Sequence, residues 1–187
     1  MKKQKKSAKT PQPGTGSTRD SIETIFRQWQ IERPDIDPEP VFIYGPISRI
    51  QAEVTAQIDK LLAPYQLVRG TFDVLTALRR AGSPFRLSPK ELARHLVLSG
   101  AGLNGRLNML ERLGYIARLP EPNDRRTLRI QLTTAGRRVV NKLSPALFDL
   151  QWSIVSGFTA SERQKFSEML MRMAEAVEQY SSRGGGR

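Results

Sequence analysis

The chain has 187 residues and a formal net charge of +12, with 30 Lys and Arg residues against 18 Asp and Glu residues. It contains no cysteine, which excludes disulfides, thiolate metal sites and thiol-based oxidant sensing. No apolar run approaches the roughly 20 residues that a membrane-spanning helix needs, and the excess of positive charge favours a polyanionic partner.

Residues 1–17 form a basic tail of Lys, Ser, Thr, Pro and Gly with almost nothing to bury. We predict that this tail is disordered. It has the charges of a signal peptide's first region but no apolar stretch behind them, so we expect a cytoplasmic protein. Two roles for the tail stay open, namely non-specific attraction to phosphates and service as a solubilising leader.

Two helices are predicted directly after the tail. The first begins after Ser21 and ends before Pro34, and residues 35–40 form a loop. Pro46 suits the first position of a helix, so we predict that it opens a long second helix that ends near Pro64.

The third predicted helix is amphipathic and covers residues 71–81. Gly82 is typical of the position that follows a helix. Three large apolar residues at helical spacing form its inward face: Phe72, Leu75 and Leu78.

A helix-turn-helix pattern follows. Ser88 is a good N-cap, Pro89 suits the first helical position, and Glu91 completes a capping box. A turn near residues 97–99 leads to a second helix, which Gly114 ends. One face of this second helix carries a leucine stripe: Leu103, Leu107, Leu110 and Leu113.

Two strands are predicted next, over residues 115–119 and 127–132. Residues 120–126 between them contain two prolines, an Asn and an Asp, which are typical of a turn. Helix, turn, helix and basic hairpin together form a winged helix-turn-helix pattern, whose simplest use is to bind duplex DNA. Residues 86–112 carry a net charge of +3 and the hairpin +2, so positive charge concentrates on the elements that would meet DNA.

Two long helices are predicted at the end of the chain. The first covers residues 134–156, with Pro145 interrupting its pattern, and the second begins at a capping box of Thr159 and Glu162 and extends to about residue 180. Large apolar side chains line both: Phe148, Trp152, Ile154, Val155, Phe158, Phe166, Met169, Leu170, Met173 and Val177. Any one of these side chains could be buried in a core. The rest of the chain offers too little apolar surface to bury all of them.

Four short motifs together carry a family resemblance. They lie at residues 99–112, 114–116, 123–126 and 132–136, where an Asp-x-Arg in the hairpin is followed by Leu-Thr-x-x-Gly. In this combination the chain resembles the MarR family of bacterial transcriptional regulators over residues 21–180. The resemblance implies a mostly α fold with a small β-hairpin wing. It also implies that the terminal helices of two subunits interdigitate, which would place the two reading helices about 34–36 Å apart on an inverted repeat.

The resemblance also suggests a division of the chain into functional segments. These are the basic tail 1–17, N-terminal helices for dimerisation and a ligand pocket at 18–66, the winged helix domain at 67–133, C-terminal dimerisation helices at 134–181, and a frayed end at 182–187.

DNA contacts are assigned to the reading helix and the wing. The resemblance places the helix of residues 99–113 in the major groove and Arg126 in the minor groove, held by Asp124. Three side chains are predicted to face the groove, opposite the leucine stripe: Asn104, Arg106 and Asn108. Arg94 and Ser99 are predicted phosphate contacts. Arg125 completes the set.

Glycines weaken the start of this reading helix. Gly100, Gly102 and Gly105 fall in or beside its first turns, where each interior glycine costs about 0.5–1 kcal/mol relative to alanine. We therefore expect the helix to begin late or to become rigid only on DNA.

A ligand pocket is suggested by a further resemblance to the urate-responsive, PecS-like branch of the family. Trp29 would stack on a purine-like or other small aromatic anion, and Asp73 would connect that pocket to the DNA-binding part. The alternative is that Trp29 anchors a core and Asp73 makes a local ion pair.

An enzyme is not expected, and neither is a cofactor. The single histidine, His95, lies in the helix-turn-helix and is expected to be a phosphate contact or a surface residue. No cluster has metal-ligand spacing. The sequence predicts a ligand-responsive repressor that binds double-stranded DNA as a homodimer. The alternative is an architectural protein without sequence specificity, which differs in sequence preference and salt dependence.

Overall fold

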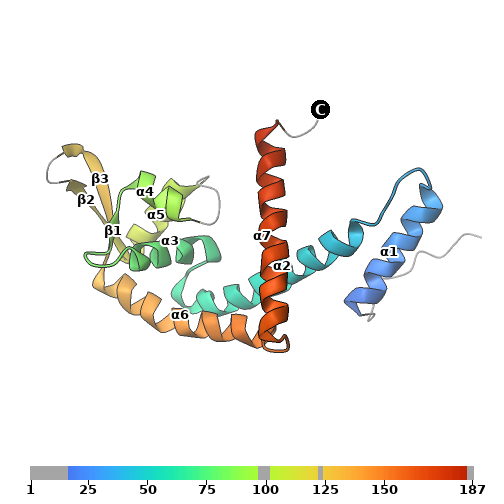
Figure 1. The fold of residues 1–187 in the computed structure, drawn as a ribbon. Helices are drawn as coiled ribbons and strands as arrows, with labels where there is room; N and C mark the ends of the chain where they lie inside the picture. Colours follow the sequence, from blue (N-terminus) through green and yellow to red (C-terminus); the bar gives the residue numbers. More distant parts are fainter. Residues whose placement is uncertain (1–16, 97–101, 122–123, 185–187) are drawn as a thin grey trace, which may run out of the picture. The chain divides into compact units, whose positions relative to one another are not determined.

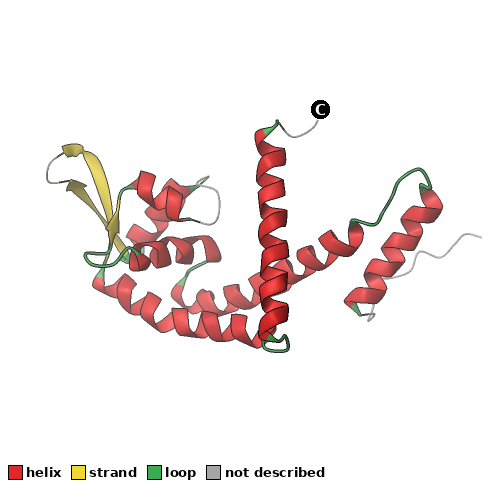
Figure 2. Cartoon of the chain, viewed as in Figure 1, coloured by secondary structure: helices red, strands yellow, loops and turns green. Residues whose placement is uncertain are grey.

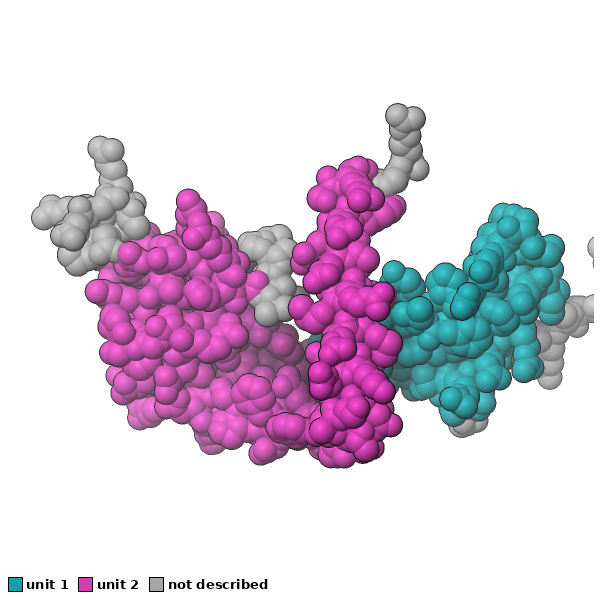
Figure 3. Space-filling model, in the orientation of Figure 1, with its two compact units in different colours: residues 1–57 teal, residues 58–187 magenta. Residues whose placement is uncertain are grey.

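The computed structural model describes residues 17–96, 102–121 and 124–184, without the side chains of residues 121 and 124–127. Most of these residues are helical, and three short strands form one sheet (Figures 1 and 2). The predicted fold class, mostly α with a small β wing, is confirmed. The chain divides into two compact units, residues 1–57 and residues 58–187 (Figure 3), and the boundary between them falls within a helix. The predicted functional segments stay predictions.

The first unit contains α1 (Thr18–Glu32) and most of α2 (Val41–Leu62). α1 begins earlier than predicted because Ser17 and Asp20 form a capping box. The Asp20 amide donates to Ser17 Oγ at 3.2 Å, and the Ser17 amide donates to Asp20 Oδ2 at 3.0 Å. Two otherwise unpaired amides of the helix start are satisfied in this way.

α2 begins at Val41, before Pro46, so the prediction that Pro46 opens this helix is wrong. A proline-rich turn supplies the first acceptors, since the Val41 amide donates to the Pro38 carbonyl and the Tyr44 amide to the Pro40 carbonyl, both at 3.0 Å. Pro46 consequently lies in the second turn, where it removes one backbone hydrogen bond.

Three helices form the centre of the second unit: α3 (Arg69–Arg80), α4 (Pro89–His95) and α5 (Leu103–Arg112). A 3₁₀ turn, η1 (Ala63–Tyr65), connects α2 to α3. Most of the largest fully buried side chains come from these helices and from the sheet: Phe72, Val74, Leu75, Leu78, Leu92, Leu107, Leu110 and Ile130. Ile58 and Leu62 at the end of α2 belong to the same group. Each such burial contributes about 1.5–3 kcal/mol. The predicted inward face of the third helix is confirmed.

The sheet contains β1 (Arg86–Leu87), β2 (Ile116–Glu121) and β3 (Asp124–Leu132), antiparallel and in the order β1-β3-β2. The sequence does not predict β1, because two residues show no alternation. Both strands of the hairpin extend into residues 120–126, which the sequence predicts as a turn. Pro120 is accommodated because β2 lies at an edge of the sheet.

Two long helices follow the sheet, α6 (Thr134–Val155) and α7 (Ala160–Ser182), close to their predicted bounds. Pro145 lies within α6 without ending it. The buried residues of α6 all lie in its first two thirds, up to Leu147, and α7 has none.

No helix within the described ranges is long and apolar enough to cross a membrane.

Candidate nucleic-acid interface

α4 begins with the predicted capping box. The Glu91 amide donates to Ser88 Oγ at 3.2 Å, and the Ser88 amide donates to Glu91 Oε2 at 2.8 Å. The Ser88 amide and hydroxyl, helped by the charge of Arg129, outweigh the effect of burial and lower the pKa of the Glu91 carboxyl. Glu91 therefore stays ionised and holds the start of α4 in place.

The reading helix α5 begins at Leu103, later than the predicted start near residue 99. Its N-cap is Gly102, whose φ of 80° lies in the left-handed region that favours glycine. The late start that the glycines suggest is therefore observed. Ser99 and Gly100 lie outside the described residues, so the predicted phosphate contact of Ser99 stays a prediction.

Two opposite faces of α5 have different environments. Leu107 and Leu110 are buried, whereas Asn104 and Asn108 are exposed on the other side. Arg94, in the last turn of α4, is also exposed. These three polar residues are therefore accessible to a partner, and their predicted contacts with DNA stay predictions.

Arg106 does not lie opposite the leucine stripe, so that prediction is wrong. It follows Leu103 by three residues and precedes Leu110 by four, which places it on the side of α5 that faces α3. A Cβ at Gly70 of α3 would lie 2.9 Å from Arg106 Cζ, so the guanidinium occupies the space that a side chain at Gly70 would need. Arg106 Nη1 is buried and has no hydrogen-bond partner in the described part of the chain.

The wing is the β2–β3 hairpin beside α4 and α5 (Figure 1). The sequence predicts a turn over residues 120–126. In the structure, β3 already includes Asp124, Arg125 and Arg126. Their side chains lie outside the described part of the structure, so their predicted contacts stay predictions.

Each strand of the wing is also tied to one helix of the helix-turn-helix. Arg118 of β2 donates from Nη2 to Asn108 Oδ1 at 2.7 Å, and its Nη1 lies 3.1 Å from Glu111 Oε2. Arg129 of β3 lies 2.5 Å from Glu91 Oε2. Sequence reasoning missed both contacts, because no spacing along the chain indicates which side chains meet across elements.

A cavity of about 220 Å³ lies between α3, the end of α4 and α6. Most of its polar wall comes from α3 and α4: Arg69, Asp73, Thr76, Arg79, Arg80 and His95. α6 adds Ser144 and Gln151 to this wall. Its apolar wall comes from the end of α4 and from α6: Leu96, Val140, Leu147 and Phe148. Three arginines against one carboxylate give the cavity a positive charge. Within the described residues, no group of three or more His, Cys, Asp and Glu side chains is arranged to hold a metal ion.

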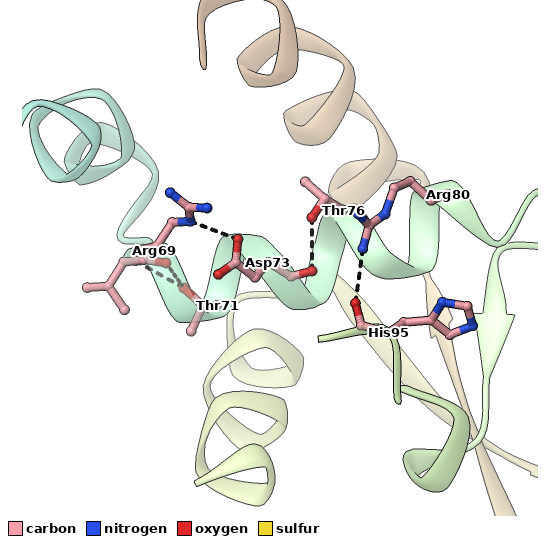
Figure 4. Close-up of polar contacts among 7 residues, drawn as sticks. Arg69, Thr71, Asp73, Thr76, Arg80 and His95 are labelled. Atoms are coloured by element: carbon pink, nitrogen blue, oxygen red, sulfur yellow. Dashed lines mark hydrogen bonds and ion pairs between the residues drawn. The ribbon is translucent and has the colours of Figure 1, made fainter. Parts of the chain in front are cut away.

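Asp73 makes a local ion pair on the wall of this cavity. Arg69 Nε donates to Asp73 Oδ1 at 2.9 Å along α3, and Arg80 Nη2 donates to the His95 carbonyl at 3.1 Å (Figure 4). The local ion pair named as the alternative for Asp73 is thus observed. Trp29 belongs to the first unit and is 48% exposed, so it is not a core anchor within its unit.

The last two helices and the turn between them expose large apolar side chains. Those exposed by 40% or more include Phe148, Trp152, Ile154, Phe158, Phe166, Met169, Leu170, Met171, Val177 and Tyr180. Large apolar side chains exposed in this number are typical of a surface that meets a partner.

Comparison with known proteins places these features in a family. The model of the MarR family matches residues 65–127, which extend from η1 into the wing. The HTH-type transcriptional regulator PecS of Dickeya dadantii (strain 3937) is 34% identical over 152 residues, an alignment that covers 81% of this chain and 92% of that protein.

Two solved structures share the fold. One is the complex of S. aureus MepR with DNA, with a TM-score of 0.63 and 23% identity, covering 70% of this chain and 94% of that chain. The other is Bordetella bronchiseptica BpsR, with a TM-score of 0.60 and 24% identity, covering 68% of this chain and 89% of that chain.

Proposed function

We propose that this chain, which belongs to the MarR family and is a transcriptional regulator rather than an enzyme, is a ligand-responsive repressor. It binds an inverted-repeat operator as a homodimer and acts in the bacterial cytoplasm, where the chromosome is. The observation that carries this proposal is the exposed polar face of α5, flanked by a basic hairpin and backed by a buried leucine face.

α5 enters the major groove with Asn104 and Asn108 toward the base edges. Arg94 and Ser99 contact phosphates and set the register. The wing contributes Arg125 and Arg126, with Asp124 orienting Arg126. Support comes from the net positive charge of these elements and from MepR, a protein with the same fold that was solved bound to DNA.

A second copy of the chain covers the exposed apolar residues of α6 and α7. Two-fold pairing would separate the two α5 helices by about 34–36 Å, one turn of DNA. Such a dimer selects an inverted repeat, because each subunit reads one half-site. The complete lack of buried residues in α7 supports this arrangement.

The cavity between α3 and α6 binds a small aromatic or purine-like anion. Its arginines attract the negative charge, and Leu147 and Phe148 pack on the ring. Asp73 reports the ligand by changing its ion pair with Arg69. The stacking of Trp29 on such a ligand stays a prediction from the sequence. The proposal is supported by the 34% identity with PecS and by BpsR, whose DNA binding is regulated by 6-hydroxynicotinic acid.

Urate is the first ligand to test. At millimolar concentration it should quench Trp fluorescence and weaken operator binding. Arg69→Met should blunt both responses, whereas Arg49→Met, on an exposed part of α2, should not. If urate changes neither signal in the unaltered protein, urate is excluded as the ligand, and the same assay is repeated with 6-hydroxynicotinic acid.

The competing function is architectural binding without sequence preference, which the basic tail favours. Incubation of the protein with randomised duplexes at about 150 mM salt, where exposed charges are screened beyond about 8 Å, separates the two. We expect repeated selection to enrich an inverted repeat with half-sites one helical turn apart. Strong retention without an enriched sequence would support the architectural function instead.

A further inference from the structure

The contact between Arg118 and α5 restricts what Asn108 can offer to DNA. Arg118 Nη2 donates to Asn108 Oδ1 at 2.7 Å, and Arg118 Nη1 lies 3.1 Å from Glu111 Oε2. One guanidinium therefore bridges two side chains that are three residues apart on α5. The Arg118 side chain is only 27% exposed, so this bridge is partly shielded from water.

The backbone of β2 holds Arg118 in place. Arg118 pairs across the hairpin with Ile130, which is buried at 1% exposure in the core of the unit. The carboxylate of Glu111 neutralises the guanidinium and fixes its second nitrogen. Arg118 is thus anchored through its strand and through Glu111 before any DNA arrives.

The chemistry of arginine determines the orientation of the Asn108 amide. A guanidinium carries N–H donors and no acceptor, so only the carbonyl oxygen of Asn108 can face it. The two N–H groups of the Asn108 amide then make no hydrogen bond to Arg118 and can donate to another partner. The oxygen lies beside a positive charge that already uses one of its lone pairs.

From this geometry we infer that Arg118 is a positioning residue that fixes Asn108 as a hydrogen-bond donor to a base edge. The inference rests on the proposed function, in which α5 lies in the major groove. Guanine offers acceptors at N7 and O6 and thymine offers O4, whereas cytosine presents the N4 amino group, a donor. The base that Asn108 reads should therefore be guanine or thymine, and cytosine should be rejected.

Adenine is expected to bind less well than guanine or thymine at this position. The bidentate pairing of asparagine with adenine requires the amide oxygen to accept a hydrogen bond from N6. Arg118 uses one lone pair of that oxygen and holds the oxygen toward β2 at 2.7 Å, so the bidentate pairing requires the amide to turn away from Arg118. A free Asn108 would lack this restriction and would accept adenine or cytosine more readily.

The test uses the operator that selection provides. Operator selection is first repeated with Asn108→Ala. The base pair that Asn108 reads is the position at which this variant no longer prefers one base. The affinity of each protein is then measured by fluorescence anisotropy for the operator and for a duplex with cytosine at that position in both half-sites. We expect the unaltered protein to lose about 10-fold or more in affinity with cytosine.

Arg118→Met keeps the aliphatic stem and removes the donors. We expect it to reduce the discrimination against cytosine to about 2-fold, which is little compared with the usual effect of a wrong base. Arg118→Lys keeps a charged donor and should retain most of the discrimination against cytosine. It replaces Arg118→Met in the test if the Met variant does not fold. Arg27→Met is the control, because it removes the same charge from an exposed position of α1 and should leave base preference unchanged.

Three outcomes would overturn the inference. Asn108→Ala could leave every base preference unaltered, cytosine could be tolerated by the unaltered protein, or Arg118→Met could weaken binding to all duplexes equally. The last result would identify Arg118 as a phosphate contact. In each case an enriched operator would still support the proposed function, whereas selection without any enriched sequence would contradict the proposed function itself.

Discussion

Gly136 lies where α6 leaves the sheet, and it has no room for a side chain. An ideal Cβ there would lie 2.1 Å from the Tyr115 carbonyl oxygen and 2.8 Å from Leu132 Cδ1. A backbone carbonyl cannot move aside as the end of a side chain can. We therefore expect Gly136→Ala to lower the free energy of unfolding by about 3 kcal/mol, measured by urea denaturation.

Gly157→Ala is the matched control for this substitution. No neighbouring heavy atom lies within 4 Å of an ideal Cβ at Gly157, in the turn between α6 and α7. Its free energy of unfolding should change little. Equal losses in the two variants would contradict the explanation from close packing and would leave the glycine of the Leu-Thr-x-x-Gly motif unexplained.

Glu91 should make stability depend on pH in the acid range. The hydrogen bonds from Ser88 lower the pKa of Glu91 in the folded chain below its ordinary value of 4.5. A lowered folded pKa means that the stabilisation is complete above the unfolded pKa and is lost as pH falls through the folded pKa. The difference in melting temperature between the unaltered protein and Glu91→Gln should therefore shrink as the pH is lowered from 7 to about 3.

The control for this experiment is Glu53→Gln, which removes the same charge from the exposed side of α2. It should show a smaller difference from the unaltered protein at pH 7, because its ion pair with Arg49 is exposed and long at 3.7 Å. A difference for Glu91→Gln that stays constant over the whole pH range would show that the capping box does not depend on ionisation.

At the scale of elements, caps and apolar spacing were sufficient to predict most helices. Ser88 with Glu91 and Thr159 with Glu162 form their capping boxes as predicted. Local signals failed where tertiary context decides. The two-residue strand β1 exists only because β3 pairs with it, and the edge position of β2 accommodates Pro120 in a segment predicted as a turn.

The candidate site was predictable to a smaller extent. Exposure of Asn104 and Asn108 follows from helical spacing alone. Arg106 is predicted to face the groove opposite the leucine stripe, but its spacing from Leu103 and Leu110 places it toward α3. The bridge from Arg118 to Asn108 could not be predicted, because it depends on how the wing folds against α5.

The wing should contribute to DNA affinity independently of dimerisation. We expect Arg126→Ala to weaken operator binding by about 10-fold. The slope of log affinity against log salt concentration should fall by about one, as expected when one contact with a phosphate is lost. Binding is measured by anisotropy at several salt concentrations, and size-exclusion chromatography should show an unchanged assembly. Arg27→Ala on α1 is the charge-matched control, and unchanged affinity of Arg126→Ala would remove the wing from the proposed interface.

At the scale of the whole molecule, the proposed homodimer requires a second copy to cover the exposed apolar residues of α6 and α7. Leu170 is 41% exposed on α7, and an arginine there would place a charge inside the proposed interface. We expect Leu170→Arg to be monomeric in analytical ultracentrifugation and to bind the operator more weakly. Gln164→Arg adds the same side chain at an exposed polar position of α7 and should stay dimeric. If Leu170→Arg and Gln164→Arg are both monomeric, or both dimeric, the interface is not centred on the apolar face.

Specific recognition of DNA by two α5 helices is the central claim, and a comparison of two affinities tests it most directly. The dissociation constant of the unaltered protein is measured at about 150 mM salt for the selected inverted repeat and for a shuffled duplex of the same composition. We predict that the inverted repeat binds at least about 1,000-fold more tightly, as specific regulators do. Equal affinity for the two duplexes would contradict the account and would identify the chain as a non-specific nucleic-acid-binding protein.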